Sequence, residues 1–162
     1  MTDQPPISNG RRGRLVAINR SNGGVPKLQV SEARITESGL EGDRQANPQL
    51  HGGPDRAITL FSLEAIEAMA REGHPIAIGS VGENLTVSQL DWTLIVPGAE
   101  LQVGAVRLRI TKYAKPCSKI RETFLNEDQS RVSPDANPGW SRVCARVLED
   151  GVVRVGDAVL VL

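Results

Sequence analysis

The chain of 162 residues contains little sulfur and few aromatic side chains, and its charges balance. It has two cysteines, Cys117 and Cys144, and its aromatic content is 3%. Two cysteines are too few for a disulfide framework, and so few aromatics provide no stacking platform for nucleic-acid bases. The 19 basic and 19 acidic residues leave no net charge, whereas proteins that bind duplex nucleic acid usually carry a basic excess. We therefore expect no nucleic-acid partner.

The sequence also lacks a hydrophobic run long enough to cross a membrane. Its start, MTDQPPISNG, has neither the basic nor the apolar region of a secretory signal. We expect a cytoplasmic protein with no membrane partner, in a compartment where thiols stay reduced. The length suits one folded unit with its own core. We predict a flexible arm over residues 1–12 and a single domain over residues 13–162.

Short strands separated by turns account for most of the chain. In residues 27–35 the apolar positions change parity between Val30 and Ala33, which indicates a bend near Ser31. The dipeptides Asp150–Gly151 and Gly156–Asp157 are typical of tight turns. Strands are predicted within residues 14–20, 27–35, 56–61, 81–87, 99–113 and 140–162.

Two segments favour helices instead. Residues 62–73 begin with Ser62, a good N-cap, and end at Gly73, with apolar positions at helical spacing between them. Residues 117–124 place Cys117, Ile120 and Phe124 on one face of a short helix. Many short strands with one or two short helices predict a mostly β (α+β) fold, a closed or nearly closed β-barrel of mixed strands.

The stretch YAKPCSKI places the Cys117 thiol directly after a proline and between Lys115 and Lys119. Only a small fraction of an ordinary cysteine is ionised at neutral pH. Nearby lysines and the start of a helix would both favour the thiolate. A thiolate can attack sulfur, hold a persulfide or bind a soft metal. Cys117 could equally pack as a small apolar side chain, and Cys144, in the middle of a predicted strand, fits that structural role better.

Two glycine-rich segments are further candidates for a site. In the first, residues 41–58, polar side chains including Arg44, His51 and Arg56 surround Gly52–Gly53. His51 could give a proton or a hydrogen bond to an anion, or the loop could be held only by its own side chains. In the second, IGSVGENL, the glycines could free backbone N–H groups for an anion, while Glu83 and Asn84 line a pocket or end a turn.

In this order, the segments GDRQAN…HGGPDRAI, VGENL, KPCSKI and GWSRVCARVLEDGVVRVGD resemble the MOSC family, the C-terminal domain of molybdenum cofactor sulfurases. The resemblance covers about residues 13–162 and implies a MOSC-like β-barrel with one functional cysteine. It implies that Cys117 is the catalytic residue, as a persulfide carrier or as the molybdenum ligand. The resemblance and the charged neighbours together give the predicted cofactor-binding residues, which are Arg44, His51, Arg56, Gly82, Glu83, Asn84, Lys115 and Lys119.

The same resemblance implies a sulfur-carrier domain or one that binds the molybdenum cofactor, molybdopterin. A cysteine desulfurase would be the partner, and pyridoxal phosphate would take part only through it. Two alternatives remain open: a molybdoenzyme that reduces N-hydroxylated small molecules with an electron-transfer partner, and a non-catalytic barrel that binds a partner or a small anion. Ser118 stands where many family members have an aromatic residue, and we expect no helical appendage after the predicted barrel.

Overall fold

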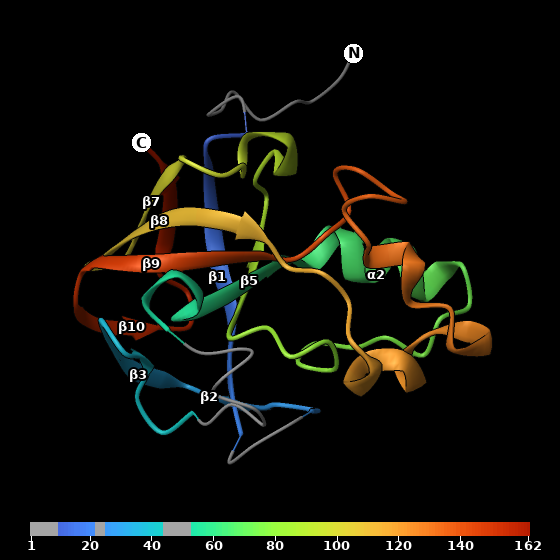
Figure 1. The fold of residues 1–162 in the computed structure, drawn as a ribbon. Coiled ribbons are helices and arrows are strands. Elements are labelled where there is room, and N and C mark those ends of the chain that lie inside the picture. The colour runs from blue at the N-terminus through green and yellow to red at the C-terminus, as the bar shows by residue number, and fades with distance from the viewer. Residues whose placement is uncertain (1–9, 22–24, 44–52) are drawn as a thin grey trace.

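The computed structural model describes residues 10–21, 25–43 and 53–162, and these form eleven strands, one α-helix and five short 3-10 helices (Figure 1). The strands are β1 (Arg12–Arg20), β2 (Leu28–Val30), β3 (Glu32–Thr36), β4 (Gly39–Leu40), β5 (Ile58–Ser62), β6 (Leu85–Ser88), β7 (Glu100–Val103), β8 (Val106–Tyr113), β9 (Val143–Glu149), β10 (Gly151–Arg154) and β11 (Ala158–Val161). The helices are α2 (Leu63–Arg71) and the 3-10 helices η1 (Pro54–Arg56), η2 (Trp92–Leu94), η3 (Ser118–Thr123), η4 (Leu125–Glu127) and η5 (Gln129–Val132).

Seven strands close into a barrel in the order β1-β11-β7-β8-β9-β5-β6 and back to β1. The last strand closes it, because β11 pairs with the start of β1, with Leu160 opposite Arg12. The pairing of β5 with β6 is parallel, whereas the other barrel pairings are antiparallel. The predicted closed barrel of mixed strands is therefore confirmed. Closure pairs each of these seven strands on both sides, which leaves only the short β2 as an edge of this sheet.

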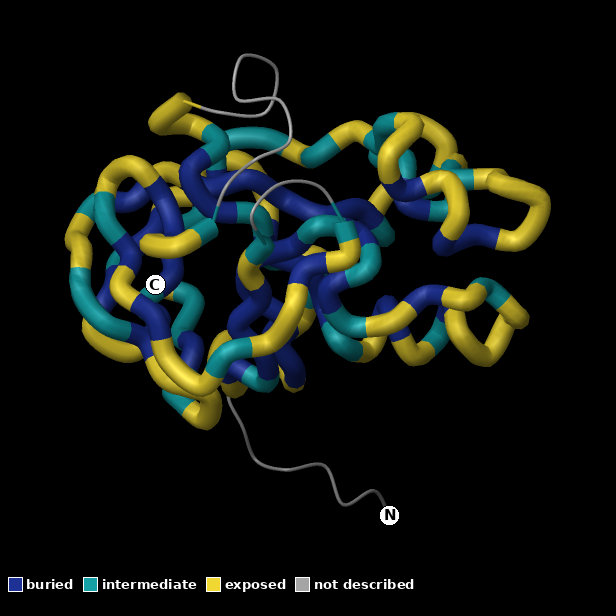
Figure 2. The backbone as a smooth tube through the Cα atoms, turned by 90° about the horizontal axis from the view of Figure 1, so that it is seen from below, coloured by how far each residue is buried: buried dark blue, intermediate teal, exposed yellow. Residues whose placement is uncertain are grey.

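The barrel interior is filled by aliphatic side chains that alternate along the strands. In β8, Val106, Leu108 and Ile110 are fully buried and point inward. Figure 2 shows the same pattern across the fold, with buried stretches inside and exposed stretches on the turns. Burying an aliphatic side chain contributes about 1.5–3 kcal/mol, so this core is the main source of stability.

A second apolar cluster lies beside the barrel, where α2 and η3 lie on the same side of it (Figure 1). Met69 from α2 packs in this cluster with Ile120 and Phe124, and all three are buried. The predicted helix over residues 62–73 is confirmed, since the Ser62 hydroxyl accepts a hydrogen bond of 3.1 Å from the Ala65 N–H. None of the described helices is long and apolar enough to cross a membrane.

The helix predicted over residues 117–124 is shorter and of another type. It is a 3-10 helix that begins at Ser118, and Cys117 precedes it with extended backbone, at φ −128° and ψ 169°. Ile120 and Phe124 enter the second cluster, but Cys117 does not. The extended residue after Pro116 turns the thiol away from that apolar face. A 3-10 helix of six residues also supplies less of the helix-end charge than the prediction assumed.

The bend predicted near Ser31 separates β2 from β3. β2 extends the barrel sheet beside β1, whereas β3 joins β10 and β4 in a small three-stranded sheet. One residue, Ser31, thus lies between strands of two different sheets. Within the glycine-rich segment over residues 41–58, Pro54–Arg56 forms η1 and Ile58 begins β5.

Candidate functional site

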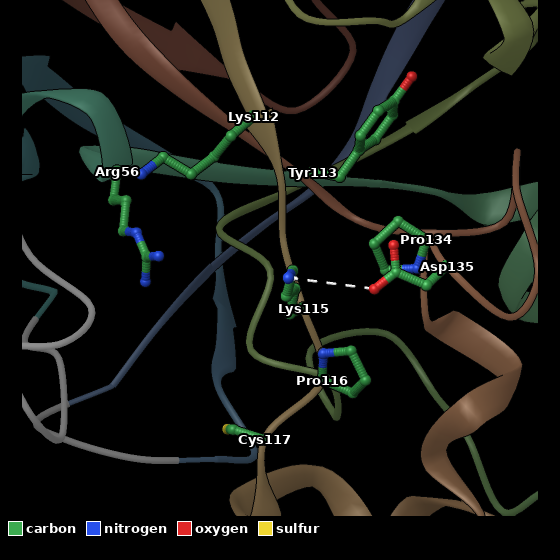
Figure 3. A pocket seen from close by; sticks show the side chains of 8 residues that line it. All are labelled: Arg56, Lys112, Tyr113, Lys115, Pro116, Cys117, Pro134 and Asp135. Carbon is green, nitrogen blue, oxygen red and sulfur yellow. Dashed lines mark ion pairs between the residues drawn. The ribbon is translucent and has the colours of Figure 1, made fainter.

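A cavity of about 590 Å³ opens where β8 ends and the chain turns toward η3 (Figure 3). Its wall consists of Arg56, Lys112, Tyr113, Lys115, Pro116, Cys117, Pro134 and Asp135. We call this cavity the thiol pocket. These residues come from η1, β8, the segment after β8 and the turn after η5. Three parts of the chain that are distant in sequence therefore meet around one cysteine.

The thiol pocket is predominantly basic. Arg56, Lys112 and Lys115 contribute three positive charges, and Asp135 contributes one negative charge. Lys115 and Asp135 are 4.0 Å apart and both strongly exposed, so their ion pair is weak. Figure 3 shows the cationic ends of Lys112 and Arg56 on the same side as the Cys117 sulfur. The pocket can therefore attract an anionic group to the thiol.

Cys117 itself is half-buried, so its sulfur can be reached from the pocket. The β8–β9 ladder continues past the strand, because the Ala114 N–H donates a 2.9 Å hydrogen bond to the Arg142 carbonyl. Beyond Cys117, its carbonyl accepts a 3.2 Å bond from the Ile120 N–H. The thiol therefore sits on a short segment that is anchored on both sides.

Cys144 has a different environment, within β9 and 5% exposed. Burial raises the pKa of the Cys144 thiol, and the positive charges of Arg142, Arg56 and Lys112 only partly oppose this. A buried, un-ionised thiol is a poor nucleophile. The structure thus places the two cysteines of the chain in contrasting settings.

The IGSVGENL segment forms a turn whose polar groups bind one another. The Gly79 N–H donates to the Glu83 carboxylate at 3.0 Å, and the Thr86 hydroxyl donates to the same oxygen at 3.1 Å. Glu83 is fully buried, and burial raises the pKa of its carboxyl group against these hydrogen bonds. A backbone N–H that could have met an external anion is therefore occupied by the side chain of the turn itself.

Asn84 connects this turn to two other segments. Its side-chain oxygen accepts a 2.9 Å bond from the Thr59 N–H in β5, and its nitrogen donates to Asp43 at 2.9 Å. Asp43 also binds the Lys27 ammonium, with both partners almost completely buried. Asn84 and Glu83 are 2% and 0% exposed. In the structure they are buried residues whose side chains bind other parts of the protein.

The predicted cofactor-binding residues occupy different positions. Arg56 and Lys115 line the thiol pocket with Cys117. Gly82, Glu83 and Asn84 belong to the neighbouring turn, with Gly82 at φ +81°. Lys119 is exposed on η3 and does not line the pocket, and Arg44 and His51 lie outside the described residues. The contacts of all these residues with a cofactor remain predictions.

Sequence reasoning missed Lys112, Tyr113 and Asp135 as pocket residues. Lys112 has the same parity along β8 as the buried Val106, Leu108 and Ile110, and a register shift separates it from Ile110. A charged side chain at an inward-facing position is the signal that could have indicated it. Asp135 lies 18 positions after Cys117 in the chain, and no local pattern connects the two. The pairing of β8 with β9 could have indicated Lys112, since it places Lys112 opposite Cys144.

Arg142 is the other functional candidate that the sequence did not reveal. It is 7% exposed and lies just before β9. Its guanidinium donates to the Val81 carbonyl at 2.9 Å and to the Lys115 carbonyl at 3.0 Å. Arg142 therefore connects the turn before Gly82 with the segment that carries Cys117.

The described residues hold no group of three or more His, Cys, Asp or Glu side chains suited to a metal ion. A bare metal ion would find only two candidate side-chain ligands among the described residues of the thiol pocket, Cys117 and the exposed Asp135. The pocket instead suits an anionic molecule, which three cations would attract and a thiol could bind or modify.

Fold and site together define a closed β-barrel domain with one accessible thiol in a basic pocket. The chain belongs to the MOSC domain family, which it matches over residues 47–160. It is 31% identical to the Escherichia coli protein YiiM over 122 residues, 72% of this chain and 54% of YiiM. It is 28% identical to the uncharacterized Bacillus subtilis protein YflK, over 82% of this chain and 60% of YflK.

Solved structures agree with this assignment. The crystal structure of E. coli YiiM superimposes with a TM-score of 0.68 at 25% identity, and the match covers 93% of this chain and 69% of that chain. The chain spans little more than half the length of the curated relatives it matches. The family therefore establishes a MOSC-type domain here.

Proposed function

We propose that this domain is a carrier in which Cys117 holds a sulfur atom as a persulfide or ligates the metal of the molybdenum cofactor. One observation carries the proposal: the accessible thiol of Cys117 shares its pocket with Arg56, Lys112 and Lys115. The MOSC family is associated with the molybdenum cofactor. A non-catalytic barrel would have no need for a reachable thiol among three cations.

As a sulfur carrier, Cys117 would accept sulfur from the persulfide of a pyridoxal-phosphate-dependent cysteine desulfurase. The Cys117 thiolate attacks the outer sulfur of that persulfide, and a new S–S bond forms at Cys117. The S–S bond of the donor breaks, and its cysteine leaves as a thiolate, so no external oxidant or reductant is needed. Lys112 and Arg56 would stabilise the anionic persulfide that results.

The residues of the thiol pocket also fit the cofactor. Molybdopterin carries a phosphate and its own metal-binding sulfurs, so the protein needs to add only one thiolate and several cations. Cys117 would be the protein ligand, and Lys112, Lys115 and Arg56 would bind the anionic groups. When bound, the cofactor would supply a redox-active molybdenum centre.

The test is sulfur uptake. The protein is incubated with a cysteine desulfurase and cysteine, and cyanide then releases the labile sulfur as thiocyanate for measurement. We expect close to one labile sulfur per wild-type chain, the same amount in C144A, and none above background in C117A. K112M should take up sulfur more slowly than R109M, a matched control on β8 that pairs with Glu100 away from the pocket.

Equal uptake by C117A and wild type would overturn the sulfur-carrier role. For the cofactor role, protein from a host that makes molybdopterin is analysed for molybdenum, and the metal should be present in wild type and lost in C117A. Molybdenum that stays with C117A would show that Cys117 is not its ligand. Thermal unfolding of each variant confirms that the barrel is intact.

A further inference from the structure

Arg142 combines deep burial with an incomplete set of partners. It is 7% exposed, and its Nε–H has no hydrogen-bond partner. Two of its other donors bind the carbonyls of Val81 and Lys115. Within the described parts of the chain, no carboxylate lies within 4.0 Å of its guanidinium. A buried charge without a carboxylate partner is costly, so its retention requires another reason.

The position of Arg142 supplies that reason. The Lys115 carbonyl lies two residues before Cys117, and the Val81 carbonyl lies in the turn that Glu83 stabilises. A second tie exists on the other side of Cys117, where the Thr123 and Ser80 hydroxyls are 2.8 Å apart. The thiol segment is thus fastened at both ends to residues 80–81. Of these ties, only the one through Arg142 brings a charge.

The electrostatics agree with this geometry. Burial lowers the pKa of Arg142, and electrostatic coupling to Cys144, Cys117 and Glu83 in their ionised forms would oppose that shift. Among the described residues, these are the titratable side chains whose charge acts on the Arg142 guanidinium. On the pocket side, Cys117 also faces Arg56, Lys112, Lys115 and Asp135. Arg142 therefore adds a positive charge to the thiol from inside the protein, where salt screens it less.

We propose that Arg142 is a positioning residue for Cys117, which ties the thiol segment to the Val81 turn and adds a buried positive charge to the thiol pocket. The planar guanidinium can reach two carbonyls at once, whereas a lysine ammonium in its place would be a single point of contact. The proposal rests on the proposed function only in taking Cys117 as the reactive residue. It concerns an anion that approaches the sulfur, whichever molecule carries it.

The charge can be tested with two alkylating reagents in a C144A background. Iodoacetate is anionic and iodoacetamide is neutral, and both react with the thiolate of Cys117. The ratio of the two rates is therefore independent of the thiolate fraction and of the accessibility of the sulfur, and it reports the effect of nearby charge on an approaching anion. We expect R142M to lower this ratio by about threefold, as for a unit charge acting over several ångström in a largely aqueous medium. R142K, which keeps the charge, and R109M should retain the wild-type ratio.

The tie can be tested by hydrogen exchange. R142K should speed exchange of the Ala114 and Ile120 amides, which flank Cys117, by more than about tenfold, because one ammonium cannot hold both carbonyls. R109M should leave both amides unchanged. An unchanged alkylation ratio in R142M, or wild-type exchange in R142K, would overturn the proposal.

If R142M does not fold, the proposal can be tested by a measurement that leaves Arg142 unchanged. Cys117 is carboxymethylated in one C144A sample and carbamidomethylated in another, and the Arg142 Nε–H signal is compared by NMR. A different chemical shift for the charged and neutral adducts supports the proposal, and identical shifts overturn it. None of these measurements needs a sulfur donor or molybdenum. A failure of the proposed persulfide role can therefore be distinguished from a failure of the proposed role of Arg142.

Discussion

The buried ion pair between Lys27 and Asp43 offers a quantitative test of how the turn around Asn84 is held in place. The Lys27 ammonium donates to both Asp43 oxygens, at 2.7 and 2.6 Å, and the two side chains are 8% and 7% exposed. Asp43 also accepts hydrogen bonds from the Ser21 N–H and from Asn84, each at 2.9 Å. The perturbation is a double-mutant cycle with K27M, D43N and K27M/D43N.

The magnitudes follow from which charge each variant leaves behind. D43N leaves the Lys27 ammonium buried without a carboxylate, which costs about 3–5 kcal/mol. K27M leaves a carboxylate that still has two N–H donors, so we expect a smaller loss of about 2–3 kcal/mol. The double variant buries no charge and should be more stable than the sum of the two losses implies, by at least about 2 kcal/mol. These are large fractions of a domain stability of about 5–15 kcal/mol.

The assay is urea unfolding followed by circular dichroism, with the free energy of unfolding extrapolated to water for all four proteins. R109M serves as a surface control and should change the free energy by less than about 0.5 kcal/mol. Strictly additive losses in the double variant would refute the reasoning, because they would show that the two side chains do not stabilise the fold as a pair.

Two further stability predictions concern single residues. In E83Q, an amide replaces a carboxyl group whose pKa is raised by burial. Because a raised pKa means that the folded protein holds the proton more tightly than the unfolded chain, the stability that protonated Glu83 contributes is fully present below its ordinary pKa of 4.5 and is lost as pH rises through the folded pKa. E83Q should lack that loss and be the more stable protein at pH 8, which urea unfolding across the pH range would measure; a parallel pH dependence of the two proteins would show that Glu83 does not titrate as proposed. In S62A, α2 loses the hydroxyl that accepts from Ala65 and should be less stable by about 1 kcal/mol, whereas S38A, on an exposed turn, should unfold like wild type; equal stability of S62A and S38A would contradict the capping role.

The strands and α2 could be predicted from sequence because local chemistry determines them. The alternation in β8 and the Ser62 cap act between neighbours in the chain. By contrast, the helix after Pro116 was predicted one residue early and as an ordinary helix. Its 3-10 form follows from tertiary packing, since Ile120 and Phe124 are drawn into the cluster beside α2. No local pattern records that cluster.

The site was predicted in part for a similar reason. Cys117 and its lysines stand next to each other in the sequence, and the resemblance of the motifs added Arg56. Lys112 and Asp135 reach the pocket only through long-range folding. Glu83 has the residue type of a ligand-binding group, yet its carboxylate binds Gly79 within its own turn. Arg142 reads in sequence as one more polar residue before a strand, and only its depth reveals its role.

The most direct test of the account compares the two cysteines of the native protein. The folded wild type is treated with a limiting amount of iodoacetamide, and the modified residue is identified by peptide mass spectrometry over time. We expect Cys117, in the thiol pocket, to react at least about tenfold faster than Cys144, which should react only after unfolding. Equal labelling of both cysteines, or a Cys117 that resists the reagent until the protein unfolds, would contradict the claim that its thiol is available for chemistry.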